Sequence, residues 1–137
     1  MRVVLDTCIL FSALRSSRGA SFRIIRSLPS SKFRPAVSTP VFFEYEEVLL
    51  RPKQFPHLSA KDIEDFLDFM ASACDHVRVN FLWRPQLPDP DDDLFLESAV
   101  SGQADAIVTY NQRDFLGSER FGIQVISPQE LIKEISL

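Results

Sequence analysis

Cysteine and histidine are scarce in this chain, which has two residues of each kind among its 137. Cys8 and Cys74 lie far apart in the sequence, so we expect reduced thiols in place of a disulfide framework. His57 falls in a proline-rich loop and His76 at the end of a predicted helix, where we expect structural or exposed side chains. None of the four has an evident catalytic setting, so other residue types must supply any chemistry.

Long apolar runs are absent as well. No run approaches the roughly 20 residues that a membrane-spanning helix needs, and no charged-then-apolar signal segment is apparent. Repeats, low-complexity tracts and linkers are missing, while the hydrophobic share of 45% and the charged share of 25% are ordinary for a globular protein. We therefore expect a single domain over residues 1–137 and a cytoplasmic location.

The net charge of −4 hides an uneven distribution along the chain. Residues 1–61 have a net charge of +6 and residues 62–137 a net charge of −10, which together give −4. A basic half beside an acidic half is compatible with binding a polyanion near an acidic metal site, and equally with attraction to a partner protein. The charge pattern alone does not decide the function.

Apolar runs typical of buried strands alternate with amphipathic segments along the sequence. Strands are predicted at residues 2–5, 34–38, 77–81, 104–109 and 123–126. Helices are predicted at residues 9–14, 20–28, 41–50, from 59 onward, from the loop 84–93 to about 102, and from 127 onward. Thr7 is the expected N-cap of the first helix, and a capping box opens the last. This order indicates βαβ units and a mainly parallel sheet with helices on both faces.

The first predicted strand runs directly into Asp6. A continuous apolar run such as residues 3–5 is typical of a strand buried on both faces, in the middle of a parallel sheet. Asp6 then lies at the carboxyl edge of the sheet, where open α/β sheets bind their ligands. The alternative is that Asp6 only caps the following helix, so other acids have to decide between the two interpretations.

Residues 89–93, with the sequence DPDDD, contain four acids in five positions. The simple explanation is a solvated turn, because negative charge at a helix N-terminus is favourable by roughly 0.3–1 kcal/mol per group. The apolar face of the next helix, however, projects back onto Asp92, whereas Asp93 projects with Glu97 toward solvent and Asp91 lies between. We expect Asp92 to point inward, where a bare carboxylate is costly without a cation.

The helix at residues 41–50 contains three glutamates. Glu47 falls opposite the buried stripe of this helix, while Glu44 and Glu46 fall at its two margins. Periodicity cannot choose between Glu44 and Glu46. For any one of the three, a partly exposed helix face is the simpler explanation.

A further polar segment, residues 109–115, follows the fourth predicted strand at the same edge as Asp6. Three or four carboxylates from distant parts of the chain thus converge on one edge of the sheet. Oxygen-only clusters suit Mg²⁺ or Mn²⁺ better than zinc. Two such cations can activate a water and stabilise the leaving oxygen in phosphodiester hydrolysis.

These segments resemble the PIN-domain family, small Mg²⁺-dependent ribonucleases of which many are toxins of bacterial and archaeal toxin–antitoxin pairs. The likeness is most evident for the branch of PIN toxins with a DPDD segment. The matching stretches span nearly the whole chain in the family's order: residues 3–7, 38–49, 89–92 and 104–109. The resemblance implies an α/β/α sandwich with a five-stranded mainly parallel sheet in the order 3-2-1-4-5, and it selects Glu44 over Glu46.

The sequence departs from the family's pattern at two positions. The family usually has Asn two residues after the first Asp, where this chain has Cys8. The fourth acid often stands two residues after the Thr of the fourth strand, where this chain has Asn111. Relatives with Asn there often retain an Asp before Phe, so Asp114 is the candidate for the fourth acid and the second metal position stays open.

The resemblance implies a metal-dependent endoribonuclease that takes Mg²⁺ or Mn²⁺, with a cognate antitoxin as partner and a homodimer as the family's habit. The expected ligands and catalytic residues are Asp6, Glu44, Asp92 and Asp114. The basic residues expected to hold the RNA backbone are Arg15, Arg18, Arg51 and Lys53. The alternative is a non-catalytic PIN-like module that binds RNA or another protein, which Cys8 and Asn111 favour.

Overall fold

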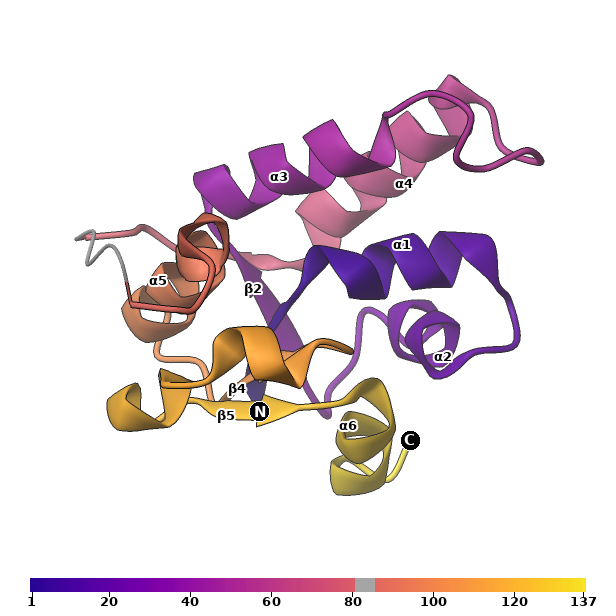
Figure 1. Cartoon of the computed structure of the whole chain (residues 1–137). Coiled ribbons are helices and arrows are strands. Elements are labelled where there is room, and N and C mark those ends of the chain that lie inside the picture. The colour runs from indigo at the N-terminus through magenta and orange to yellow at the C-terminus, as the bar shows by residue number, and fades with distance from the viewer. Residues whose placement is uncertain (81–85) are drawn as a thin grey trace.

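The first strand, β1 (Arg2–Leu5), lies at the centre of a parallel sheet in the order β3-β2-β1-β4-β5, as the sequence predicts (Figure 1). The other strands are β2 (Arg34–Val37), β3 (Asp75–His76), β4 (Ala106–Val108) and β5 (Gln124–Ile126). The computed structural model describes residues 1–80 and 86–137. The central strands β1 and β4 are apolar and buried almost throughout, because helices cover both of their faces.

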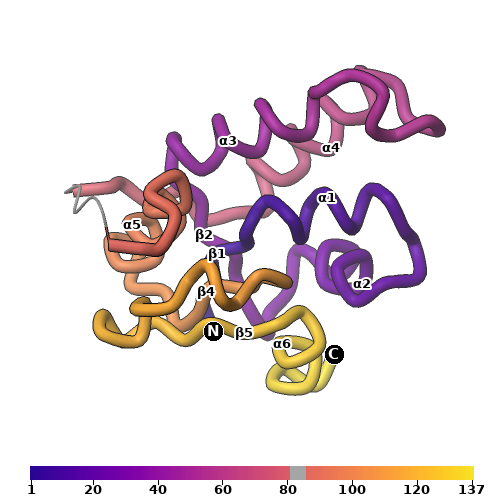
Figure 2. Tube along the Cα trace, viewed as in Figure 1, coloured from indigo at the N-terminus to yellow at the C-terminus, as the bar shows by residue number. Residues whose placement is uncertain are grey.

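The described residues form six α-helices, five between strands and one after β5. They are α1 (Thr7–Arg15), α2 (Ala20–Arg26), α3 (Thr39–Leu49), α4 (Ala60–Ala73), α5 (Asp93–Ser101) and α6 (Pro128–Glu134). Helix α5 packs against β1, β2 and β4, while α2 and α6 contact each other on the other side of the strands (Figure 1). Helices α3 and α4 run side by side at the top of the view (Figure 2). The layers are those of an α/β/α arrangement.

Three short 3₁₀ turns complete the described segments: η1 (Pro90–Asp92), η2 (Gln112–Phe115) and η3 (Ser118–Phe121). Two of them matter for the site, because η1 leads directly into α5 and η2 follows β4. Both lie after segments that end at the carboxyl edge of the sheet, where polar side chains gather.

Three of the helix starts follow the capping chemistry of the sequence. Ser38, Ser59 and Ser127 each accept a hydrogen bond from a backbone N–H of the first turn, and the predicted capping box of α6 is present. The expected N-cap of α1, Thr7, is wrong: Asp6 occupies that position and makes no side-chain capping bond. Its carboxylate is turned toward β4 instead, which frees Asp6 for another role.

The third strand differs from the prediction. A strand is predicted at residues 77–81, but β3 is Asp75–His76 and residues 77–80 are irregular. Phe81 lies outside the described residues. Arg2 on β1 and Arg34 on β2 lie 2.9 and 2.6 Å from the Asp75 carboxylate, so two ion pairs add to the backbone pairing of β3 with β2. The hydrogen bonds and charge of Arg34, together with Arg2, lower the pKa of Asp75 to about 2.

In residues 1–80 and 86–137, no helix combines the length and the apolar character needed to cross a membrane. The cytoplasmic location and the single-domain organisation stay predictions.

Candidate functional site

Asp6 lies at the point where β1 leaves the sheet. Its backbone N–H donates to the carbonyl of Val108 at 3.0 Å, which continues the pairing with β4. Its side chain is only 8% exposed, and its Oδ2 accepts hydrogen bonds from Thr109 Oγ1 at 2.7 Å and Cys8 Sγ at 3.3 Å. Burial raises the pKa of Asp6, and these hydrogen bonds oppose the rise.

The Thr109 hydroxyl is itself fixed from the chain that follows it. The backbone N–H of Asn111 donates to Thr109 Oγ1 at 2.9 Å, so the hydroxyl proton is directed to Asp6. Cys8 Sγ lies 3.7 Å from the same hydroxyl oxygen. Burial, followed by the charge of Asp6, raises the pKa of the Cys8 thiol to about 12. Asp6 is therefore a buried carboxylate with one oxygen held by two donors.

The predicted orientation of the acids at the start of α5 is wrong for Asp93. Asp93 is 1% exposed and Glu97 3%, so neither side chain points to solvent. The Asp93 carboxylate accepts hydrogen bonds from the backbone N–H groups of Leu87 at 2.9 Å and Gln86 at 3.1 Å. The projection fails because α5 is buried on most sides, so the side shared by Asp93 and Glu97 does not face solvent. The backbone donors make the burial of Asp93 tolerable.

Asp92 is half-buried and lies among acids that are remote in sequence. Burial raises its pKa to about 7, and the charges of Asp6, Asp89, Asp114 and Asp91 add to the rise. Asp92 thus faces the Asp6 side of the site although Asp93 is the more deeply buried of the two. This electrostatic coupling favours Asp92 as the site residue from this segment.

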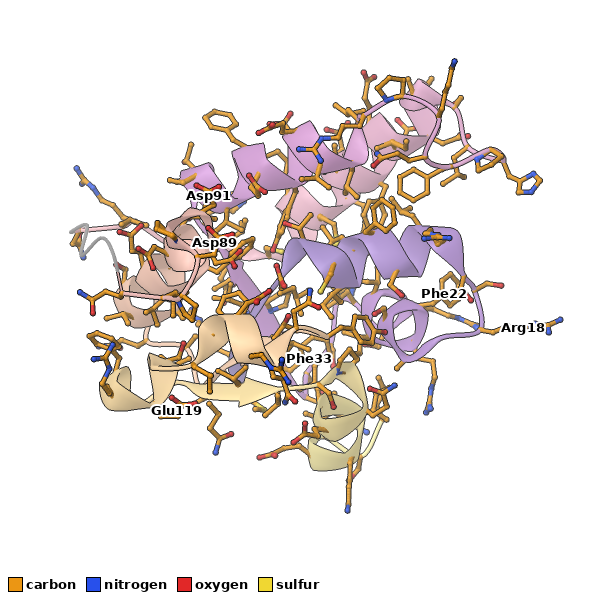
Figure 3. The ribbon with its side chains drawn as sticks, in the orientation of Figure 1. Arg18, Phe22, Phe33, Asp89, Asp91 and Glu119 are labelled. Carbon is orange, nitrogen blue, oxygen red and sulfur yellow. The ribbon has the colours of Figure 1, made fainter. Side chains whose placement is uncertain are left out.

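Glu44 joins the same group from α3. Glu44 and Glu46 are half-buried and Glu47 is exposed, as periodicity predicts. Burial, followed by the charge of Glu47, raises the pKa of Glu44; Arg51 opposes the rise, and Asp91 and Asp6 add to it. Figure 3 shows Asp89 and Asp91 beside the N-terminal end of α3. Glu44 therefore lies on the side of α3 that faces the other acids.

Asp114 approaches from η2. Its backbone N–H donates to the carbonyl of Asn111 at 2.9 Å, which forms the turn after β4. The side chain is exposed, and its charge raises the pKa of both Asp6 and Asp92. The contribution of Asp114 to both shifts favours it as the fourth acid, since Asn111 bears no charge.

These four acids have the chemistry of a site for a hard cation. All of their potential ligand atoms are carboxylate oxygens, which Mg²⁺ and Mn²⁺ prefer. The ion pairs that the described residues form engage Asp75, Glu47 and Asp65, none of which belongs to this group. As the side chains stand, no three His, Cys, Asp or Glu residues of the described chain are close enough to hold a metal. The electrostatics fit a cation, and the carboxylates would have to close around it.

The predicted RNA-contacting residues lie elsewhere. Arg15, at the end of α1, lines a hollow of about 330 Å³ with residues 54–58, and its guanidinium lies 5.6 Å from the centre of the Phe11 ring. Arg51 and Lys53 line a neighbouring hollow that shares part of the same loop. Arg18 lies in the loop after α1, on the opposite side of the view from Asp89 and Asp91 (Figure 3). Three of the four predicted residues thus gather around one loop.

Sequence reasoning missed three contributors to the site. Thr109 and Cys8 hold the Asp6 carboxylate, and Asp93 anchors the loop that leads to Asp92. The sequence could have indicated a role for Thr109, because this polar residue ends the apolar run 106–108, which is predicted to reach the same sheet edge as Asp6. Cys8 has no comparable signal in a single sequence.

A family model described as "PIN domain" matches residues 2–113, which is most of the chain. The chain belongs to the PIN domain family. The matched range contains Asp6, Glu44 and Asp92, and it ends one residue before Asp114.

Solved structures share the fold of this PIN domain. One chain of VapBC2 from Rickettsia felis, solved bound to a DNA fragment from the promoter, is 17% identical with a TM-score of 0.66, over 93% of this chain and 98% of that chain. VapBC-1 from nontypeable Haemophilus influenzae is 15% identical with a TM-score of 0.64, over 94% of this chain and 99% of that chain. A comparison of this chain with curated proteins found no significant match. At such identities the likeness shows the fold.

Replacing Asp92 by Asn should stabilise the metal-free PIN domain at neutral and alkaline pH. The Asp92 pKa is raised from 3.8 to about 7, so the native state loses stability relative to the unfolded state as pH rises from about 4 to about 7. Because Asp92 is partly exposed, we expect a gain of about 1–2 kcal/mol at pH 8, or roughly 3–6 °C in Tm. Thermal melts in EDTA at pH 4 and pH 8 measure it.

Millimolar Mg²⁺ should raise the Tm of the wild type more than that of Asp92→Asn, because the cation binds the native acids. Asp68→Asn on α4 is the control, since it neutralises an exposed acid outside the group. If Asp92→Asn melts below the wild type in EDTA and Mg²⁺ moves both equally, Asp92 is an ordinary residue of the helix start.

Proposed function

We propose that this PIN domain is a divalent-metal-dependent endoribonuclease that hydrolyses phosphodiester bonds of RNA and acts as the toxin of a toxin–antitoxin pair. The carrying observation is the group of acids at the carboxyl edge of the sheet, where Asp6, Glu44 and Asp92 all have raised pKa values. Membership of the PIN domain family supports the same chemistry.

Asp6, Glu44 and Asp92 are the proposed ligands of Mg²⁺ or Mn²⁺, and Asp114 assists directly or through water. The chemistry that such a cation supplies is activation of water and stabilisation of charge on phosphate oxygens. The chain's own residues prepare the site. Thr109 fixes the Asp6 carboxylate, and the backbone N–H groups that bind Asp93 anchor the loop that presents Asp92.

The RNA backbone is proposed to contact Arg15, Arg51 and Lys53. Arg18, in the loop after α1, is proposed to contact a more distant part of the same strand. Arg15 and Asp6 stand at opposite ends of α1. Nine residues of helix span about 14 Å, so a strand of several nucleotides is needed to bridge the acids and the basic loop. Phosphate contacts of this kind position the RNA without reading its sequence.

A cognate antitoxin is the proposed partner. Both of the solved structures described above are of VapBC proteins, which supports a toxin–antitoxin assignment. The homodimer stays a prediction from the family's habit.

The second candidate function is a non-catalytic module that binds RNA or a protein. It is favoured by the present spacing of the acids, in which no three of the described His, Cys, Asp or Glu side chains are close enough to hold a metal. Cys8 and Asn111 favour it as well, since both depart from the family's usual residues. This candidate predicts metal-free RNA or protein binding without cleavage.

Cleavage of a single-stranded RNA should require Mg²⁺ or Mn²⁺ and stop in excess EDTA. Asp6→Asn and Asp92→Asn should each lower the rate by roughly a hundredfold or more, because even residues that only support metal ligands contribute about 10–100-fold. A gel assay with a labelled oligonucleotide measures the rates, with Asp68→Asn as the control variant. Cleavage that persists in EDTA would rule out the metal mechanism.

Variants at Asp114 and Asn111 test whether Asp114 is the fourth acid of the site. Asp114→Asn should weaken the metal dependence or slow the cleavage, because a carboxylate that couples to Asp6 and Asp92 is lost. Asn111→Asp should keep or raise the activity by adding a carboxylate at the neighbouring turn. Mg²⁺ titrations of the cleavage rate compare both variants with the wild type. An Asp114→Asn variant with unchanged rate and metal affinity would make Asp114 a turn residue only.

A further inference from the structure

Cys8 contacts Asp6, one of the four acids of the candidate site, and the proposed function assigns Cys8 no role. It is the second residue of α1 and is half-buried. Its Sγ lies 3.3 Å from Asp6 Oδ2 and 3.7 Å from Thr109 Oγ1, so the thiol has two potential acceptors within hydrogen-bonding distance. The shorter contact is to the carboxylate.

The carboxylate is also the better acceptor for the thiol proton. Hydrogen bonds to an ionised oxygen are stronger than those to a neutral hydroxyl. Thr109 Oγ1 already accepts from the Asn111 N–H and uses its own proton toward Asp6 Oδ2. The arrangement that satisfies all of these groups therefore has two donors, one hydroxyl and one thiol, on the same oxygen of Asp6.

This arrangement makes the two oxygens of Asp6 unequal. A carboxylate oxygen accepts about two hydrogen bonds, so Oδ2 is fully used by Thr109 and Cys8. The side chain is consequently held in one rotation about its Cβ–Cγ bond, aided by a hydrogen bond from the Thr7 backbone to the carboxyl group, and Oδ1 is the oxygen to which neither Thr109 nor Cys8 donates. The two donors to Asp6 come from different segments: Cys8 is on α1, and Thr109 follows β4.

We propose that Cys8 is a positioning residue for divalent-metal binding, because its thiol and the Thr109 hydroxyl together fix Asp6 so that Oδ1 is presented to the cation. The inference rests on the proposed function, in which Asp6 is a metal ligand. Residues that hold ligating carboxylates are an integral part of metal sites, and their loss costs about 10–100-fold in metal affinity or activity.

Direct coordination by sulfur is the competing role. A cysteine ligand binds metals as a thiolate, which would remove the donor and place a second negative charge 3.3 Å from Asp6 Oδ2. The observed contact is that of a donor and an acceptor. A sulfur ligand would also favour thiophilic cations such as Cd²⁺ over Mn²⁺, which separates the two roles experimentally.

The test is calorimetric titration of the EDTA-treated, dialysed full chain with MnCl₂, together with thermal melts of the metal-free proteins. Cys8→Ala should bind Mn²⁺ about tenfold more weakly than the wild type, at the low end of the usual range because a thiol is a weak donor. Cys8→Ser should stay within about threefold, since its hydroxyl also donates. Cys74→Ala is the matched control, because it removes the other thiol from the end of α4.

Each outcome bears on a different claim. Mn²⁺ affinity of Cys8→Ala equal to that of the wild type overturns the positioning role and leaves the proposed function intact. A wild type that binds no Mn²⁺ overturns both. Titration with CdCl₂ completes the test: a Cd²⁺ preference that is lost in both Cys8→Ser and Cys8→Ala makes Cys8 a ligand and overturns the positioning role. If Cys8→Ala does not fold, Cys8→Val removes the donor with a side chain of similar size.

Discussion

The parallel pairing of β1 with β4 is the constraint on which the candidate site depends. Leu5 is in register with Val108, so Asp6 and Thr109 leave the sheet side by side although 103 positions separate them in the chain. Because side chains alternate between the two faces of a strand, a slip of one residue in this pairing would put the Asp6 and Thr109 side chains on opposite faces. The register of β1 with β4 is thus what builds the site.

Carboxylates of this fold are found in three environments: paired with arginines, bound by backbone N–H groups, or close to other acids. Asp75 is paired with two arginines, and Asp93 is buried against two backbone N–H groups, so both are stabilised where they stand. Asp6 has donors on one oxygen, while Asp92 and Glu44 have raised pKa values that reflect burial and their acidic neighbours. This uncompensated charge is what a divalent cation would relieve, and it is the physical basis of the proposed function.

The carboxyl end of β1 could be predicted from the sequence, and side-chain orientation at the turns could not. Asp6 follows a run of apolar residues, so its place at the sheet edge needs no tertiary information, and family resemblance supplied the strand order. Asp93 is buried because α5 is covered on most sides, including the side of Asp93 and Glu97 that periodicity assigns to solvent. Asp6 stands at the N-cap position of α1 in place of Thr7, and its carboxylate binds the Thr109 hydroxyl, from the end of a distant strand, instead of capping the helix. β3 pairs with β2 at Asp75 and His76, ahead of the predicted range, and the Asp75 carboxylate there forms ion pairs with Arg2 and Arg34 that a single strand's sequence does not reveal.

A crystal structure of the chain grown with MnCl₂, with anomalous scattering used to locate manganese, tests the central claim most directly. The account predicts a manganese ion bound by Asp6 through Oδ1 and by Glu44 and Asp92, with these carboxylates drawn closer together than in the metal-free arrangement. Manganese bound only at other acids, or no ordered manganese while Asp6, Glu44 and Asp92 remain apart, would contradict it.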